Sequence, residues 1–299
     1  MTTHTETEIA SQPDCWSRAV ELAGTAALPR PGERVAVIGC GTSWFMAQAY
    51  AVLREAAGHG ETDAFAASEA PLGRTDGGSP GRPYDRVLAL TRSGTTTEVL
   101  DLLRRLDGTR TTAITADPDT PVMTLADEVV VLDFADEKSV VQTRFATTQL
   151  ALLRAHLGED LGRAIADVER AVAEPVPAEL VGAEQFSFLG RGWTCGLAQE
   201  AALKMREASR SWTEAYPAME YRHGPISIAG PGRVTWMLGT APEGLAGDVR
   251  NAGGTFVTRD ADPMAELVRV QRVAVARAHA QGLDPDQPLH LTRSVILSS

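Results

Sequence analysis

The sequence has 299 residues, of which 43% are hydrophobic and 22% charged, and its formal net charge is −11. This length exceeds the usual size of one domain, so two compact α/β units or one large unit are expected. The 28 basic residues are scattered along an acidic chain, which argues against a nucleic-acid partner. No apolar run approaches the roughly 20 residues of a membrane span, and no basic signal-peptide start is present. We therefore expect a cytoplasmic protein with no membrane partner.

Three cysteines, Cys15, Cys40 and Cys195, lie far apart and form no CxxC pair. This spacing fits neither a disulfide framework nor a zinc site. We expect reduced thiols, no metal and no cofactor.

The N-terminal half alternates short apolar strands with helices. Residues 1–14 are expected to form a flexible tail. Strands are then expected at residues 34–40, 86–90 and 111–115, and helices at residues 44–57 and 98–106. Such alternation predicts a parallel sheet with helices on both faces.

The C-terminal half repeats this order. Strands are expected at residues 186–189, 234–238 and 255–257, and a helix at residues 196–211. A helical connector over about residues 147–173 precedes a proline-containing boundary at residues 174–178. The sequence therefore predicts an α/β protein with two doubly wound parallel-sheet domains in tandem, residues 15–173 with the connector helices and residues 174–299.

Five hydroxyl residues fall within residues 91–97, and Gly94 frees the backbone to turn directly before a helix. The N-terminus of a helix presents unpaired N–H groups and partial positive charge, so the run predicts a phosphate site that needs no clustered cations. The alternative is an ordinary N-cap with spare hydroxyl groups. Neither the GxxxxGK[ST] nor the GxGxxG nucleotide motif is present.

A second cluster lies on the helix that begins near residue 196. Glu200, Lys204, Glu207 and Ser211 are spaced by four, three and four residues, so they lie along one helix face. A solvent-exposed ladder of ion pairs is the alternative interpretation. The following residues, 212–225, are expected to form a loop that presents the imidazole of His223. A carboxylate and a histidine together can move protons on a sugar.

Taken together, the motifs CGTSW, SGTTTE, FLGRG, EAALKMREAS, EAYPAMEYRHGP and DPDQPLHLTRSV resemble the sugar isomerase (SIS) family. They are similar to the isomerase half of glucosamine-6-phosphate synthase and to free-standing type II glucosamine-6-phosphate deaminases. The resemblance extends from about residue 8 to the C-terminus. It implies two flavodoxin-like SIS domains and a C-terminal tail that reaches the active site. No glutaminase domain precedes residue 1, so we expect no glutamine-driven synthesis.

The resemblance also implies roles for individual residues. Glu207 takes the place of the base that moves a proton between carbons 1 and 2, with Lys204 one turn before it. His223 takes the place of the ring-opening histidine, which the family donates across the interface of a homodimer. The implied binding residues for the phosphosugar are Gly41, Thr42, Ser43, Thr91, Arg92, Ser93, Thr96 and Gln142.

Three positions depart from the family. Arg293 stands where the family has a lysine that can form a Schiff base, and a guanidinium cannot be that nucleophile. Arg92 replaces an expected glutamine, and Gln142 replaces a small hydroxyl residue. Arg293 is therefore expected to act by charge.

The sequence leaves three functions open for the protein. Proton abstraction at carbon 2 of glucosamine 6-phosphate or its N-acetyl form leads to isomerisation or deamination. Expulsion of the carbon 3 hydroxyl instead makes the protein a dehydratase, that is, a lyase. A non-catalytic SIS module that senses sugar phosphates is the alternative of another class, although no DNA-binding segment accompanies it.

Overall fold

The computed structural model describes residues 2–72 and 83–297, which form two compact units. Each unit is discontinuous in sequence. One contains Cys15–Asp136, Arg144–Asp160 and Thr292–Ser299, and the other contains Met1–Asp14, Glu137–Thr143 and Leu161–Leu291. We call them the five-stranded and the four-stranded unit after their sheets.

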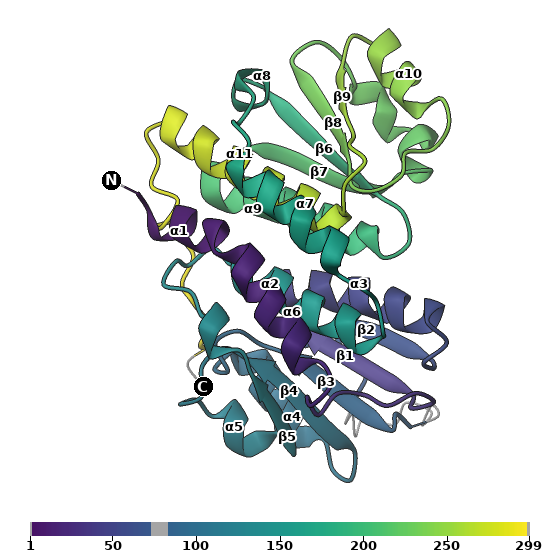
Figure 1. The fold of residues 1–299 in the computed structure, drawn as a ribbon, viewed down its shortest axis with the longest axis vertical. Coiled ribbons are helices and arrows are strands. Elements are labelled where there is room, and N and C mark those ends of the chain that lie inside the picture. Colours follow the sequence, from purple (N-terminus) through teal and green to yellow (C-terminus); the bar gives the residue numbers. More distant parts are fainter. Residues whose placement is uncertain (1, 73–82, 298–299) are drawn as a thin grey trace. The chain divides into compact units, whose positions relative to one another are not determined.

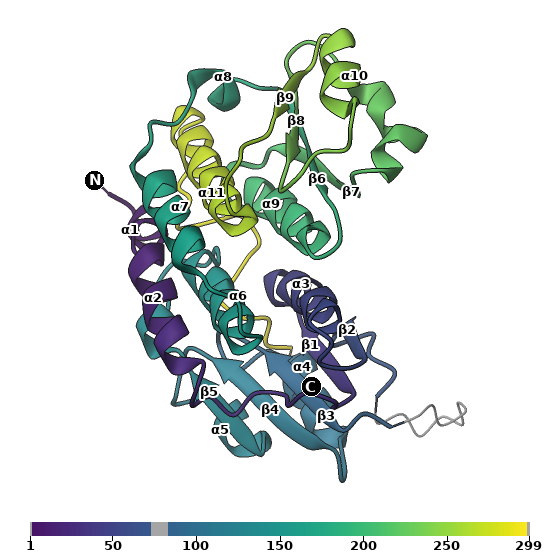
Figure 2. The same ribbon diagram turned by 45° about the vertical axis from the view of Figure 1, so that its right-hand side comes forward.

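The five-stranded unit holds a fully parallel sheet in the order β2-β1-β3-β4-β5 (Figures 1 and 2). Its strands are β1 (Val35–Gly39), β2 (Thr62–Ala66), β3 (Arg86–Leu90), β4 (Arg110–Thr115) and β5 (Glu128–Val131). The strand order is that of flavodoxin-like folds, whose ligands bind where the winding direction reverses, between β1 and β3. The helical elements are α2 (Gln12–Leu22), α3 (Thr42–Ala56), α4 (Thr97–Arg105), α5 (Val122–Leu125), the 3₁₀ turn η1 (Asp133–Ala135) and α6 (Arg144–His156).

Strands β1 and β3 are entirely buried, as near-continuous apolar runs predict for a parallel sheet covered on both faces. Ile38 of β1 and Val87 of β3 belong to one core cluster with Val99 and Leu103 of α4. The apolar spacing on α4 thus fixes the start of this helix at the carboxyl end of β3.

The four-stranded unit repeats the scheme with the parallel order β7-β6-β8-β9. Its strands are β6 (Gln185–Gly190), β7 (Trp212–Pro217), β8 (Arg233–Met237) and β9 (Thr255–Val257). Its helices are α1 (His4–Ala10), α7 (Gly162–Ala173), α8 (Ala178–Val181), α9 (Thr194–Ser209), α10 (Leu245–Asn251) and α11 (Pro263–Ala280), with 3₁₀ turns η2 (Glu220–His223) and η3 (Pro225–Ile228). The predicted pair of doubly wound parallel-sheet domains is confirmed.

In each sheet, one strand ends at a glycine whose position has no room for a Cβ atom. A Cβ atom on Gly39, at the end of β1, would lie 2.7 Å from the carbonyl carbon of Ser43, and one on Gly190, at the end of β6, would lie 2.3 Å from the carbonyl oxygen of Thr194. Each glycine allows the following helix to start close against the strand that precedes it.

The N-terminus differs from the expected flexible tail. Residues 4–10 form α1, which begins with a capping box between Thr3 and Glu6. The carboxylate of Asp286 accepts hydrogen bonds from the N–H groups of His4 and Thr5 at 2.7 and 2.8 Å. Contacts far along the sequence therefore order a segment that looks locally like a polar tail.

Two further expectations need correction. The connector is two helices, α6 and α7, and α7 belongs to the four-stranded unit although we expected it in the N-terminal domain. The expected loop over residues 212–225 begins with strand β7, because residues 212–217 pair with β6 along its whole length. In the described part of the chain, no helix combines the length and apolarity that a membrane crossing requires.

Candidate functional site

The switch point of the five-stranded sheet carries the expected binding residues. Thr42 and Ser43 follow β1 at the start of α3, and both are buried. Gly41 precedes them with a positive φ of 53°. Thr91, Arg92 and Ser93 follow the neighbouring strand β3 and are buried as well. The two strand ends therefore present their polar residues at one edge of the sheet.

We call residues 91–97 the cradle. Gly94 turns its backbone with a φ of 60°, and a Cβ atom there would lie 2.1 Å from the Thr120 hydroxyl oxygen, so only glycine fits. Thr96 occupies the N-cap position of α4, yet its side chain makes no capping hydrogen bond. The alternative interpretation, an ordinary N-cap, therefore fails for Thr96, whose hydroxyl oxygen lies 3.4 Å from that of Ser294.

The Thr91 side chain is a buried polar group at the start of the cradle. It is 3% exposed, and its hydroxyl oxygen has no hydrogen-bond partner among the described residues. Buried polar groups in proteins almost always have a partner, whether protein, water or ligand. Hydroxyl groups and N–H groups at the start of a helix are donors that can bind a phosphate.

The C-terminal segment enters the cradle. The hydroxyl groups of Ser93 and Thr95 donate to the Ser294 Oγ at 3.1 and 3.0 Å. An Nη2 hydrogen of Arg92 is donated to the carbonyl oxygen of Arg293 at 3.0 Å. The guanidinium of Arg293 itself forms an ion pair with Asp136, with 2.5 Å between Nη2 and Oδ1.

In the four-stranded unit, α9 carries the expected proton-transfer pair. The helix is rich in Ala, Leu, Met, Glu and Lys, which favour helix, and it ends at Arg210 in the left-handed conformation. The ammonium of Lys204 contacts the Glu207 carboxylate and lies 3.4 Å from that of Glu200. The alternative of a solvent-exposed ladder is therefore wrong, because Lys204 and Glu200 are fully buried.

Burial alone would lower the pKa of Lys204, but the carboxylates of Glu200, Glu207 and Glu137 raise it above its ordinary value. The raised pKa keeps the Lys204 ammonium charged where it contacts the Glu207 carboxylate. The Glu207 side chain is 17% exposed, so it is the member of this group that meets solvent. A half-buried carboxylate beside a fixed cation is suited to accept and return a proton.

His223 and Gln142, the remaining expected residues, both belong to the four-stranded unit. His223 is exposed at the end of η2, in the four-stranded unit, with Lys204 and Glu207. Gln142 belongs to the same unit, and its side-chain oxygen is buried without a hydrogen-bond partner among the described residues. The structure thus groups the cradle with Arg293 in one unit and Lys204 with Glu207 in the other.

Sequence reasoning missed Glu137, Glu8 and Ser294. Glu137 is buried and accepts hydrogen bonds from the N–H and hydroxyl groups of Thr143. The Glu8 carboxylate accepts the N–H groups of Lys138 and Ser139, and burial, followed by the nearby Glu137, raises its pKa. No local pattern marks Glu8 or Ser294, because their partners lie 130 or more positions along the chain. Ser294 lies within the motif DPDQPLHLTRSV, but its residue type alone predicts no role for it.

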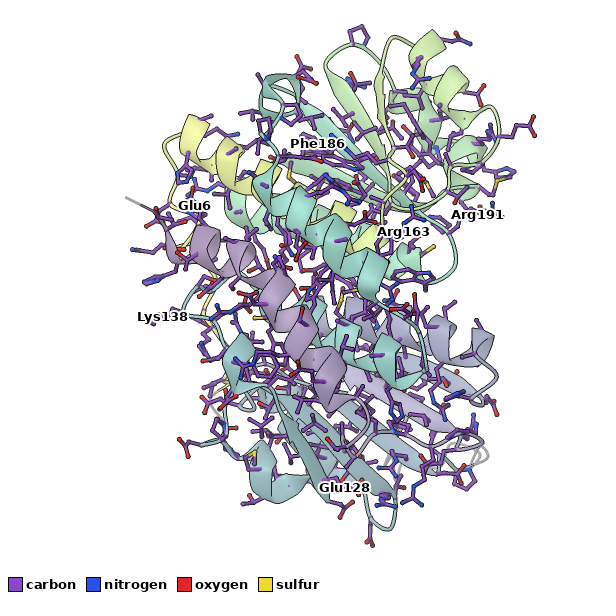
Figure 3. All side chains as sticks on the ribbon, in the orientation of Figure 1. Glu6, Glu128, Lys138, Arg163, Phe186 and Arg191 are labelled. Atoms are coloured by element: carbon purple, nitrogen blue, oxygen red, sulfur yellow. The ribbon has the colours of Figure 1, made fainter. Side chains whose placement is uncertain are left out.

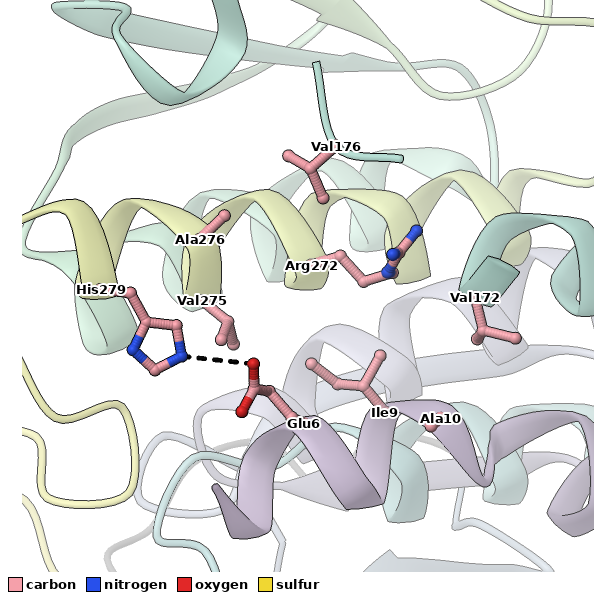
Figure 4. Close-up of a pocket in the computed structure, with 9 residues that line it drawn as sticks. All are labelled: Glu6, Ile9, Ala10, Val172, Val176, Arg272, Val275, Ala276 and His279. Carbon is pink, nitrogen blue, oxygen red and sulfur yellow. Dashed lines mark hydrogen bonds and ion pairs between the residues drawn. The ribbon is translucent and has the colours of Figure 1, made fainter. Parts of the chain in front are cut away.

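A cavity of about 290 Å³ lies elsewhere in the four-stranded unit, between α1, α7 and α11 (Figure 4). Its polar groups already serve the fold. His279 pairs with Glu6 at 3.3 Å, and Arg272 donates to the carbonyl oxygen of Ala171 at 2.7 Å. None of the expected site residues lines this cavity. Among the described residues, no group of three or more His, Cys, Asp or Glu side chains could hold a metal ion.

No protein-family model matches the chain. The sequence is similar to the isomerizing glutamine–fructose-6-phosphate aminotransferase of Sulfurisphaera tokodaii, at 27% identity over 88% of this chain and 50% of the relative. The corresponding protein of Gloeobacter violaceus is 30% identical over 88% of this chain and 52% of the relative. The chain thus spans about half the length of these curated relatives.

The fold resembles the crystal structure of a glucosamine-6-phosphate deaminase from Thermotoga maritima, with a TM-score of 0.81 and 24% identity. That match covers 99% of this chain and 100% of the other. The similar sequences and the shared fold confirm the resemblance to the sugar isomerase (SIS) family that the motifs predicted, and the fold has two parallel-sheet domains in tandem.

Proposed function

We propose that the chain is an enzyme that acts on an amino-sugar 6-phosphate, either glucosamine 6-phosphate or its N-acetyl form. The similarity to a glutamine–fructose-6-phosphate aminotransferase and to a glucosamine-6-phosphate deaminase supports this substrate class. The observation that carries the proposal is the contact between Glu207 and the buried Lys204. A carboxylate that contacts a buried ammonium and reaches solvent is placed to act as the base in proton abstraction beside a carbonyl.

In the proposed reaction His223 first opens the sugar ring. Glu207 then removes the proton from carbon 2 of the open chain, and the electron pair of that C–H bond moves into an enediol or enolamine. Return of the proton to carbon 1 completes an isomerisation, which leaves an imine at carbon 2 when the amine is free. Addition of water to this imine forms the ketone and releases ammonia, which is deamination. We propose that the cradle binds the 6-phosphate throughout, and that His223 is donated from the second subunit of a homodimer.

The lysine content favours a reaction without a covalent sugar adduct. The sequence contains two lysines, Lys138 and Lys204. Lys138 is exposed on the surface (Figure 3), whereas Lys204 is buried against carboxylates that raise its pKa. An amine must lose its proton to attack a carbonyl, so the environment of Lys204 opposes this role. Arg293 cannot take it either.

The second candidate reaction is elimination of water from N-acetylglucosamine 6-phosphate. An acetylated amine leaves poorly as ammonia, so expulsion of the carbon 3 hydroxyl becomes the alternative fate of the same intermediate. The pairing of Arg293 with Asp136 favours this candidate, since it puts a fixed cation where the family has an amine nucleophile.

The test is NMR of the purified protein in heavy water with each phosphosugar in turn. Deuterium exchange at carbon 2 reports the proton abstraction that all routes share. Deuterium at carbon 1 of the product, ammonia release and a new alkene signal identify isomerisation, deamination and dehydration respectively. Glu207→Gln should abolish the exchange at carbon 2, whereas the exposed Glu169→Gln on α7 should leave it unchanged. No turnover of either sugar by the unmodified protein would favour a sensor, and a loss below tenfold in Glu207→Gln would assign the base elsewhere, because general-base removal costs about 100- to 10,000-fold.

A binding experiment tests the cradle separately from catalysis. Ser93→Ala and Thr96→Val should weaken the binding of glucosamine 6-phosphate measured by calorimetry. Thr124→Val on α5 removes an exposed hydroxyl of the same unit and should have no effect. Equal affinity of the unmodified protein for phosphorylated and free sugar would contradict a phosphate site.

A further inference from the structure

The C-terminal residues 293–297, which we call the strap, fill the cradle with a side chain of the protein itself. Three hydroxyl oxygens surround Ser294 Oγ, those of Ser93 at 3.1 Å, Thr95 at 3.0 Å and Thr96 at 3.4 Å. Two of them donate to it. An oxygen that receives several hydroxyl donors at the start of a helix occupies the position expected for a phosphate oxygen.

The strap also forms hydrogen bonds with the first residue of α4. The N–H group of Thr97, the first residue of α4, donates to the carbonyl oxygen of Val295 at 3.1 Å. In return, the N–H group of Leu297 donates to the Thr97 hydroxyl oxygen at 2.9 Å. The strap therefore satisfies a donor that an anion at this helix would otherwise use.

Polar contacts hold the strap, and apolar burial contributes little. Val295, Ile296 and Leu297 remain 51%, 70% and 58% exposed. Neutral hydrogen bonds contribute little net stability because water replaces them, whereas hydrogen bonds to an ion are roughly twice as strong. A phosphate dianion can therefore compete successfully for the same donors.

From these contacts we propose that the strap is an internal competitor for the phosphate of the substrate, with Ser294 as the residue that imitates a phosphate oxygen. Binding of phosphate then requires the release of Ser294 from the cradle. Arg293 ties the strap to Asp136 at 2.5 Å, so this ion pair acts as the second anchor. The inference rests on the proposed function, because it requires the cradle to be a phosphate site.

Affinity for the phosphate group is the first test. Ser294→Ala removes the competing hydroxyl, so inorganic phosphate and glucosamine 6-phosphate should both bind about three- to tenfold more tightly to the full-length variant, since each lost hydrogen bond changes affinity by up to about tenfold. Ile296→Ala, which alters an exposed side chain of the same strap, should bind as the unmodified protein does. Weaker or unchanged binding by Ser294→Ala would overturn the inference.

Hydrogen exchange gives a second and independent readout in the unmodified protein. Saturating phosphate should speed deuterium uptake by the C-terminal peptide, because the Leu297 N–H group loses its partner when the strap leaves. A strap that instead closes over bound phosphate would take up deuterium more slowly, and this result would refute competition while leaving the phosphate site intact. Failure of phosphate to bind to any variant would refute the cradle and the inference together.

Discussion

The Lys204 ammonium lies 3.4 Å from the Glu200 carboxylate, and the two side chains are 1% and 0% exposed. Two charges taken out of water depend on each other, because the loss of one leaves the other without compensation. The pair therefore holds α9 in its native packing, and it also places the Lys204 ammonium against the Glu207 carboxylate.

Lys204→Met should destabilise the protein by about 3–5 kcal/mol, because Glu200 then stays buried without its cation. The measurement is a urea titration followed by circular dichroism. Lys138→Met, at the exposed lysine, is the matched control and should change stability by less than about 0.5 kcal/mol. The double variant Lys204→Met/Glu200→Leu should recover part of the loss, and a double variant less stable than Lys204→Met would contradict this account.

Gly94→Ala should damage both the fold of the cradle and the binding of phosphate. The positive φ of 60° is unfavourable for alanine, costing roughly 1–2 kcal/mol, and the new Cβ atom would meet the Thr120 hydroxyl at 2.1 Å. Gly108→Ala is the matched control, since its φ is 70° but nothing lies within 4 Å of the added atom. The melting temperature of Gly94→Ala should therefore fall further than that of Gly108→Ala, and equal falls would show that the close approach is unimportant.

Local sequence patterns were sufficient for the most apolar strands, but not for β2 and β7 or for the contacts that order the ends of the chain. The β-branched runs of β1 and β3 identify buried parallel strands. Strand β2, with the sequence TDAFA, has neither a continuous apolar run nor clear turn signals, and β7 mixes polar with aromatic residues. Pairing with a neighbouring strand makes both of them strands.

The site residues also fall into two groups, those with a local sequence pattern and those without one. The hydroxyl run of the cradle and the spacing of Lys204 and Glu207 are local, so both could be predicted. Ser294 meets Ser93 across 201 positions of sequence, and Glu8 meets Ser139 across 131. No periodicity connects such residues, because the fold alone brings them together.

Acid should weaken the five-stranded unit through Glu33. Burial alone would raise the pKa of Glu33, but the Arg86 guanidinium, 2.9 Å away, lowers it below the ordinary value of 4.5. The unfolded state then binds more protons than the folded state, so the contribution of Glu33 is present above pH 4.5 and is lost as the pH falls through the lowered pKa. Glu33→Gln should cost about 1 kcal/mol at pH 7 and progressively less below pH 4.5, as measured by urea unfolding across this range. A cost that does not change with pH would contradict the ion pair as its cause, and Glu169→Gln serves as the exposed control.

The proposed donation of His223 across a dimer interface predicts complementation. Glu207→Gln and His223→Ala should each be inactive alone. After subunit exchange, a mixed dimer contains one site with both native residues, so activity should return to at most half of the unmodified level. Mass spectrometry of differently labelled subunits verifies the exchange. Exchange without recovered activity would place His223 in the site of its own subunit or outside catalysis.

Arg293→Lys tests whether residue 293 acts by charge or by covalent attachment. A lysine can still pair with Asp136, so the strap should keep its place, but the amine can also attack an open-chain carbonyl, lose water and form a Schiff base. Borohydride treatment with phosphosugar should therefore trap an adduct on residue 293 of the variant and none on the unmodified protein, as read by mass spectrometry of the peptides. Arg104→Lys, at an exposed arginine of α4, provides a new surface lysine as the control and should trap nothing specifically. If the unmodified enzyme is a dehydratase, the variant should also lose elimination, because the fixed cation has become an amine that reacts. An adduct trapped on Lys204 of the unmodified protein would overturn the non-covalent reaction and would make that buried amine the nucleophile.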